Sequence, residues 1–237
     1  MCTVTFIPGT GSDYTLTSSR DEQTTRLHAK GPELVHYESY SLLYPKDPKG
    51  GGTWIACNNT GKTTCLFNGA FKIHAPKYPY RHSRGLIVLD FFKFPDAKSF
   101  SREYDLENIE PFTFVIIQNK TLTEFKWDGV NTHLLNHNFA HPRIWSSVTL
   151  YDSEIIRLRE KWFDEWKEAN PSPKQNDSIN FHIKAGDGRK ETDVLMERKN
   201  FDLRTVSITS VAVIKNKTRM EYIDLINNKT QIKELDH

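Results

Sequence analysis

Residues 2–22 of this 237-residue chain read CTVTFIPGTGSDYTLTSSRDE, and this stretch decides the expected fold. Two runs rich in Thr and in apolar or aromatic residues, 2–7 and 13–18, flank the turn Gly9-Thr10-Gly11. Such runs are typical of β-strands, and a short glycine-rich turn between them indicates a hairpin. The sequence therefore predicts an N-terminal antiparallel hairpin that brings Arg20-Asp21-Glu22 back to within a few ångströms of Cys2.

Position 2 carries a residue type with a specific chemical meaning. Methionine aminopeptidases remove Met1 when the next side chain is small, so Cys2 is a candidate mature N-terminus. It would then hold a thiol nucleophile and an α-amino group of pKa ~7.7–8, and so supply its own base. A hairpin that returns an Arg and an Asp to the first residue is the layout of an N-terminal-nucleophile hydrolase. The alternative is that Cys2 is a small buried apolar residue.

Four further polar residues are candidate partners of this nucleophile. Arg20 beside a thiol favours the thiolate, and Asp21 within reach of the α-amino group would orient it. A surface salt bridge is the alternative for this pair. Asn68 and Asn136 each end a strand-like run, and a carboxamide N–H there would stabilise an oxyanion, a contribution of ~2.7–4 kcal/mol in enzymes.

Several motifs along the chain together resemble a known family. They are Met1-Cys2, Arg20-Asp21-Glu22 with Arg26, Gly51-Gly52-Thr53-Trp54-Ile55-Ala56, Thr64-Cys65-Leu66-Phe67-Asn68, Leu134-Leu135-Asn136, Pro142-Arg143-Ile144-Trp145 and Arg204-Thr205-Val206-Ser207. The chain is similar to the NRDE family, also called Transport and Golgi organisation protein 2-like. The matches span most of the chain and are dense over the first 70 or so residues. Ser19 stands where the family motif has Asn.

The resemblance implies a four-layer αββα sandwich of two antiparallel sheets, in a single domain over 1–237. It also implies two classes of function. One is an amidase that cleaves a non-peptide C–N bond, with Cys2 as nucleophile, Arg20 and Asp21 holding it, and Asn136 in the place of the oxyanion Asn of related choloylglycine-type cysteine amidases. The other is a carrier whose pocket binds an apolar ligand, haem or an acyl chain.

The remaining elements follow from periodicity and from turn residues. Further strand-like runs lie at 53–58, 63–68, 112–118, 121–126 and 205–214. Helices are expected over Gly85–Phe94 with Ser83 as cap, over Lys98–Asn108, and over Asp152–Ala169. Residues 170–200 are polar and variable, with a short helix as one reading. Strands first, helices in the middle and strands last suit two antiparallel sheets between helices.

The stretch 56–63, ACNNTGKT, fits a relaxed phosphate-loop pattern. A phosphate loop must lead from a strand into a helix, whereas the following residues, Thr64-Cys65-Leu66-Phe67, are typical of a returning strand. The sequence predicts a hairpin at 53–68 that does not bind ATP. Cys57 and Cys65 flank its turn and are expected to be packed thiols rather than a disulfide.

His133, His137 and His141 are spaced by four residues, which on a helix would align three imidazoles for a metal or haem. Gly129, the Asn residues of this region and Pro142 disfavour a helix here, so we expect separate histidines on a strand and loop, and no metal site.

Composition limits the classes of partner and compartment. The formal net charge of +2 gives no strong attraction to nucleic acid, and no apolar run approaches the ~20 residues of a membrane helix. Three cysteines and no apparent signal segment are consistent with a reducing compartment, so a cytoplasmic protein is expected. The partner is expected to be a small amide or an apolar molecule. The sequence leaves the oligomeric state open.

Overall fold

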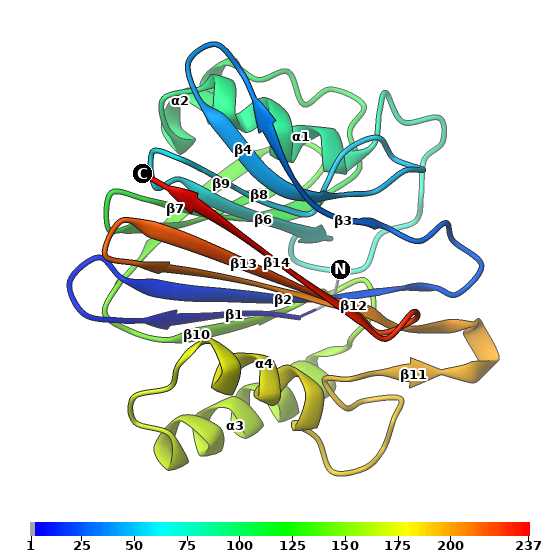
Figure 1. The fold of residues 1–237 in the computed structure, drawn as a ribbon. Coiled ribbons are helices and arrows are strands. Elements are labelled where there is room, and N and C mark those ends of the chain that lie inside the picture. The colour runs from blue at the N-terminus through cyan, green and yellow to red at the C-terminus, as the bar shows by residue number, and fades with distance from the viewer. Residues whose placement is uncertain (1–2) are drawn as a thin grey trace.

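The computed structural model describes residues 3–237, so Cys2 lies outside the described residues. The chain forms two antiparallel sheets packed face to face, with one pair of helices outside each sheet (Figure 1). From top to bottom the layers are helices α1 and α2, sheet B, sheet A, and helices α3 and α4. This order confirms the predicted αββα architecture.

Sheet A has the strand order β10-β1-β2-β12-β13-β14, with β11 paired to β12. Its strands are β1 (Thr3–Pro8), β2 (Tyr14–Gln23), β10 (Arg143–Ser146), β11 (Glu197–Arg198), β12 (Leu203–Ile214), β13 (Lys217–Asp224) and β14 (Lys229–Asp236). Segments from both ends of the chain therefore lie side by side, because β2 pairs with β12 over ten register positions.

Sheet B is a meander in which each strand pairs with the next along the chain. Its strands are β3 (Lys30–His36), β4 (Ser41–Lys46), β5 (Ile55–Asn58), β6 (Thr63–Asn68), β7 (Phe112–Gln118), β8 (Thr121–Trp127) and β9 (Thr132–His137). The helices are α1 (Arg84–Asp90), α2 (Ala97–Glu103), α3 (Ser153–Ala169) and α4 (Gln175–Lys184), with short 3-10 turns η1 (Phe91–Lys93) and η2 (Lys199–Phe201).

The N-terminal hairpin forms as predicted for the described residues. Thr3 pairs with Ser19 and Pro8 with Tyr14, in antiparallel register. Strand β2 continues five residues beyond the expected end at position 18, to Gln23. The continuation is polar in sequence but is stabilised by pairing with β12, which supplies a hydrogen-bonding partner along its second edge.

Three helices form where the sequence predicted them, one of them shorter than expected, and the 170–200 region contains a fourth. Ser83 caps α1 by accepting from the Gly85 amide, and Asp152 caps α3. Helix α2 ends at Glu103 rather than Asn108, because residues 104–108 turn away to pack Leu106 and Ile109 in the outer core. The 170–200 region contains α4, a ten-residue helix that the polar composition only weakly indicated.

Seven of the described strands were not predicted: β3, β4, β9, β10, β11, β13 and β14. Most of these lack a sustained run of β-branched residues, and β3, β9, β10 and β14 are edge strands with exposed polar positions. Pairing with a neighbour decides such strands more than intrinsic propensity does.

The 53–68 segment is a β-hairpin, as predicted. Lys62 is buried and donates from Nζ to the carbonyl oxygens of Phe94 and Pro95, at 2.7 and 3.3 Å. Its ammonium group is therefore used to hold the end of η1. Cys57 and Cys65 are free, buried thiols that face Thr63 and Ile55 across the ladder rather than each other.

The two helix layers meet their sheets through different chemistry. Sheet B contacts α1 and α2 through an aromatic core that includes Phe91, Phe100 and Phe114. Sheet A presents mainly hydroxyl side chains to α3 and α4. Buried His182 of α4 hydrogen-bonds Thr5 Oγ1 through Nε2 at 2.9 Å and Ser19 Oγ through Nδ1 at 2.7 Å.

Burial and the nearby Arg159 charge lower the pKa of His182 to about 3. The imidazole is therefore neutral, with one ring nitrogen donating and the other accepting. Its hydrogen bonds continue as a chain through Ser178 and Thr17 to Ser210. This layer is held by satisfied polar groups rather than by apolar area alone.

We expect His182 to make folding stability depend on pH. Its folded-state pKa lies below the ordinary value near 6.5, so its contribution is present above pH 6.5 and is lost as the pH falls toward 3. Between pH 7 and 5 the loss is about 2 kcal/mol. Urea unfolding of wild type and of His182→Gln at both pH values measures this loss. The variant should lose less stability than wild type, and equal losses would contradict the assignment.

Candidate active site

Arg20 lies between the two sheets at the end of the strands where β1 begins. Side chains alternate along β2, so Arg20 shares the inner face with the core residues Tyr14 and Leu16. The guanidinium carbon is 4.9 Å from the centre of the Trp54 ring of sheet B, a cation–π contact. Arg20 is 4 % exposed, so its charge is held in a largely dry environment.

Three charged side chains, Glu22, Arg26 and Asp47, surround this arginine. Arg20 lies 3.4 Å from Asp47 and 3.7 Å from Glu22, and Arg26 approaches the same two carboxylates at 2.6 and 3.3 Å. Burial alone would raise the pKa of Asp47, but the Arg26 hydrogen bond and the charges of both arginines outweigh it and lower that pKa. The cluster thus fixes Arg20 in place with balanced charge.

Asp21 faces the opposite side of sheet A from Arg20, because neighbouring residues of a strand point to opposite faces. Its carboxylate accepts hydrogen bonds from Tyr151 Oη at 2.7 Å and from Thr205 Oγ1 at 2.5 Å. The sequence predicted that Arg20 and Asp21 both hold the nucleophile. In the structure they flank the start of β1 from two faces of the sheet.

Arg159 of α3 connects Asp21 to the first strand. It is fully buried, donates from Nη1 to Thr3 Oγ1 at 2.6 Å, and stacks on the Tyr151 ring with its guanidinium carbon 3.7 Å from the ring centre. Its other donors bind the carbonyl oxygens of Thr192 and Asp193. One network thus holds Thr3, the residue that follows Cys2, and orients Tyr151 toward Asp21.

Ser19, at the family's Asn position, points into the polar layer beneath sheet A, where it bonds His182. It does not face Arg20. The sequence reasoning did not identify Tyr151, Arg159, Asp47 or His182 as site residues. Tyr151 and Arg159 are more than 120 positions from the hairpin that they support, and no local motif marks them.

Asn68 and Asn136 are not brought to one point. Asn68 ends β6 opposite Phe112, and its carbonyl oxygen accepts from Ser147 Oγ at 2.8 Å. Asn136 is exposed on edge strand β9, accepts from Thr123 Oγ1 at 2.8 Å, and borders an open groove of about 630 Å³ beside Asp96 and Gln118. Its partner Thr123 lies near the β7–β8 turn, away from the strand end that carries Asn68. The geometry therefore separates Asn136 from Arg20.

The histidines lie on a strand and a loop, as expected. His133 and His137 are on β9 and bond Asp128 and Glu124, at 2.7 and 2.6 Å, and His141 follows in a turn. Within residues 3–237, no group of three or more His, Cys, Asp or Glu side chains is placed to hold a metal ion.

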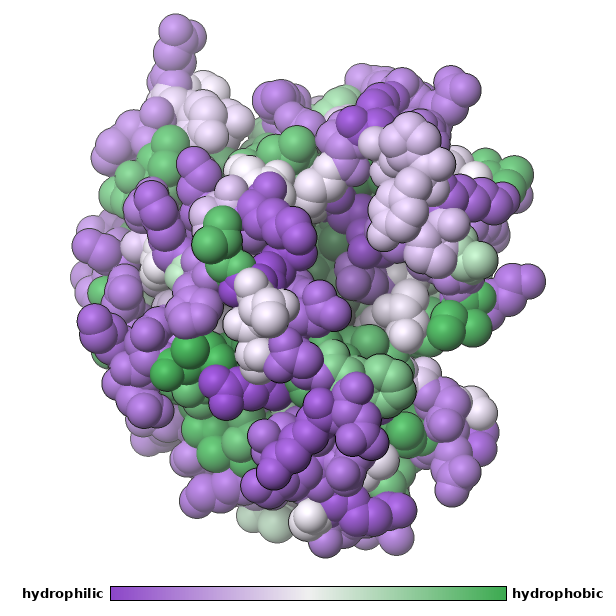
Figure 2. All heavy atoms as spheres, turned by 90° about the vertical axis from the view of Figure 1, so that its right-hand side faces the viewer, coloured by the Kyte–Doolittle hydropathy of each residue, from purple (hydrophilic) through white to green (hydrophobic). Residues whose placement is uncertain are grey.

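The site end of the strands points toward the viewer in Figure 2, where the surface is hollowed and apolar residues gather around the hollow. A narrow pocket beside Arg20 is lined by Glu22, Arg26, Tyr222 and Asp224, among others, and leaves about 10 Å³ open to water. This is roughly the room of one water molecule.

Across residues 3–237, Trp54 Nε1 and Thr209 Oγ1 are among the buried side-chain atoms without a hydrogen-bond partner.

The fold is that of the N-terminal-nucleophile hydrolases. Two structures of conjugated bile acid hydrolase from Clostridium perfringens are similar: a mutant with alanine for the cysteine at position 2 (TM-score 0.56, 8 % identity, 100 % of this chain and 97 % of that chain) and an arginine-to-leucine variant (0.58, 10 %, 99 % and 92 %). A Caenorhabditis elegans N-acylethanolamine-hydrolyzing acid amidase orthologue is also similar (0.50, 14 %, 88 % and 92 %).

The chain belongs to the Transport and Golgi organisation 2 family, whose sequence profile matches residues 1–170. No curated protein matches the chain in a sequence comparison. None of the helices in the described residues is long and apolar enough to cross a membrane.

We expect Tyr151→Phe to destabilise the protein through Asp21. The variant removes a hydrogen bond to a buried carboxylate, which should cost about 1–3 kcal/mol of unfolding free energy. Tyr104→Phe is a matched control, since Tyr104 Oη donates to Asp90 at 2.9 Å in a less buried setting. Urea unfolding should show a larger loss of unfolding free energy for Tyr151→Phe than for Tyr104→Phe. A larger loss for Tyr104→Phe would contradict the proposal that the buried Asp21 carboxylate needs the Tyr151 hydrogen bond.

Proposed function

We propose that this protein is a cysteine N-terminal-nucleophile amidase that cleaves a non-peptide C–N amide bond. The supporting observation is the position of Arg20. Thr3, which follows Cys2 in the chain, pairs with Ser19, and Arg20 is the next residue of β2, buried on its inner face. A fixed cation near the chain start would stabilise a thiolate at Cys2.

In the proposed reaction, removal of Met1 exposes the α-amino group of Cys2. This amine takes the thiol proton, directly or through one water, and the thiolate attacks the amide carbonyl. The C–N bond then breaks as the leaving amine receives that proton, which leaves a thioester on Cys2. Water hydrolyses the thioester, releasing the carboxylic acid and restoring the thiol.

The described residues have complementary roles in this proposal. Arg20 supplies positive charge on the inner face. Asp21, Tyr151, Arg159 and Thr3 hold the start of β1 from the other face, so that the attacking group keeps a fixed geometry. An oxyanion donor must lie about 2.7–3.1 Å from the reacting oxygen. Asn136 lies on edge strand β9, away from Arg20 and the start of β1, so it has no role in the proposed mechanism.

The thiol of Cys2 can be titrated selectively. Burial raises the pKa of Cys65 to about 12 and also raises that of Cys57, and both thiols are 0 % exposed. Iodoacetamide alkylation of the folded protein should therefore label Cys2 alone. We predict that the pKa of the Cys2 thiol lies below the ordinary value near 8.5. In Arg20→Gln this pKa should be higher than in wild type by about 1–2, because the nearby positive charge is lost. The pH profile of the alkylation rate measures this.

Arg26→Gln is the control, because Arg26 contacts the same carboxylates but its side chain is 23 % exposed, compared with 5 % for Arg20. It should shift the thiol pKa less than Arg20→Gln does. The same pKa in wild type and Arg20→Gln would remove the proposed role of Arg20.

Turnover separates the amidase from the carrier of an apolar ligand. Intact-mass spectrometry should show a chain that lacks Met1. In a panel of N-acyl amines, Cys2→Ala should abolish cleavage and Cys2→Ser should slow it severely, since a hydroxyl is a weaker nucleophile than a thiolate. Cleavage by Cys2→Ala at the wild-type rate would contradict the proposal. A wild type that cleaves nothing but binds haem or an acyl chain tightly would favour the carrier.

A further inference from the structure

The loop 71–79, FKIHAPKYP, between β6 and α1 exposes large apolar side chains. Phe71 is 56 % exposed, Ile73 71 % and Tyr78 80 %. Scattered single apolar residues are normal on a surface, but several within one short segment indicate a binding surface. The loop lies at the right of Figure 1, on the side where β1 begins.

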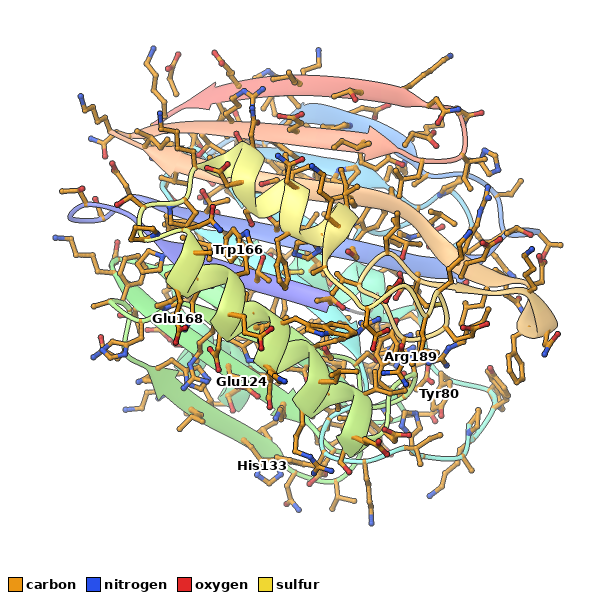
Figure 3. The ribbon with its side chains drawn as sticks, turned by 90° about the horizontal axis from the view of Figure 1, so that it is seen from below. Tyr80, Glu124, His133, Trp166, Glu168 and Arg189 are labelled. Carbon is orange, nitrogen blue, oxygen red and sulfur yellow. The ribbon has the colours of Figure 1, made fainter. Side chains whose placement is uncertain are left out.

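The exposed apolar surface continues onto the β8–β9 turn. The Phe71 ring meets the His133 ring edge-on with centres 4.9 Å apart, and Lys126 Nζ lies 4.7 Å from the Phe71 ring centre. His133 bonds Asp128, and Val130, 78 % exposed, follows in the same turn. Figure 3 labels Tyr80, which follows the loop, at the right of the view from below and His133 at its lower edge. We call Phe71, Ile73, Tyr78 and Val130, with the lysines between them, the loop surface.

The charged side chains within residues 71–79 are of one sign, and Asp128 of the adjoining turn is paired with His133. Residues 71–79 contain Lys72 and Lys77 and no acidic residue. Both lysines are exposed, and among the described residues neither forms an ion pair. Glu110, which His74 of the loop contacts at 3.2 Å, is also bound by Arg84 at 2.9 Å. Free cations thus alternate with apolar side chains.

We propose that the loop surface docks the protein onto an anionic lipid bilayer. Apolar side chains enter the headgroup region, Tyr is favoured at that depth, and lysines bind anionic headgroups with their stems against the apolar layer. A protein partner fits less well, because lysine is depleted in protein interfaces. The net charge of +2 gives little long-range attraction, so the binding is local, reversible and salt-sensitive.

Docking would place the candidate site next to the bilayer. The loop starts just after Asn68, whose carbonyl bonds Ser147 beside the end of β10, the neighbour of β1. A substrate with an acyl chain would then reach the hollowed face from the membrane. The proposal does not depend on the amidase reaction, and its test uses no catalytic readout.

The test is co-sedimentation of the full-length protein with vesicles of phosphatidylcholine alone or mixed with phosphatidylserine. Wild type should bind the mixed vesicles, bind the neutral ones weakly, and be released by added salt. The variant Lys72→Glu, Ile73→Ser, Lys77→Glu should bind the mixed vesicles more weakly than wild type. Each lysine near an anionic membrane contributes roughly fivefold to the affinity, so the affinity should fall by at least that factor for each of the two lysines. These side chains are exposed and outside the core, and circular dichroism should show an unchanged fold.

The matched control lies in the β12–β13 turn at the opposite end of sheet A: Ile214→Ser, Lys215→Glu, Lys217→Glu. This turn also carries one exposed apolar side chain, Ile214 at 52 %, and two exposed lysines. The control should bind the mixed vesicles like wild type. Wild-type protein that stays in the supernatant, or equal loss of binding in both variants, would overturn the proposal. So would a wild-type dimer that the loop variant converts to monomer without any vesicle binding, because the occupant would then be a second copy of the chain.

Discussion

The structure depends on the burial of β2 between two paired neighbours. Strand β2 pairs with β1 on one edge and with β12 on the other, so its backbone groups are satisfied and both of its faces can be buried. One face contributes Tyr14 and Leu16 to the core between the sheets and ends in Arg20. The other face contributes Thr17, Ser19 and Asp21 to the layer under α3 and α4. The candidate site exists because both sets converge at one strand end.

The two helix layers make different physical contributions. The aromatic core between sheet B and α1–α2 buries apolar area and tolerates rearrangement within limits. The layer between sheet A and α3–α4 is instead ordered by buried His182 and Arg159, each of which has specific hydroxyl or carbonyl partners. A buried polar network is costly when any partner is missing, so it specifies one arrangement of helix and strand. This suits the layer that holds Thr3 and Asp21.

The face that carries the site also carries the loop surface. Balanced charges surround Arg20 in a pocket with almost no free volume, while the loop 71–79 presents unpaired cations and exposed apolar side chains a short distance away. The candidate site, with its buried and balanced charges, thus lies on the same face as an exposed surface of lysines and apolar side chains. A protein that acts on acylated amines would use both, since the scissile bond is polar and the chain attached to it is apolar.

The sequence by itself determined the N-terminal hairpin, the 53–68 hairpin, helix α3 with its Asp152 cap and the αββα layers, because strand periodicity, glycine turns and caps are local signals and the family motifs are dense there. It also marked Arg20 and Asp21. Only the tertiary structure decided that these two face opposite sides of sheet A, that Asn136 lies apart from them, and that Tyr151, Arg159 and His182 support the chain start. The supporting contacts join residues more than 100 positions apart through side chains, and no local pattern of residues encodes them. The opposite facing of Arg20 and Asp21 follows from strand alternation once pairing with β12 extends β2 beyond position 18.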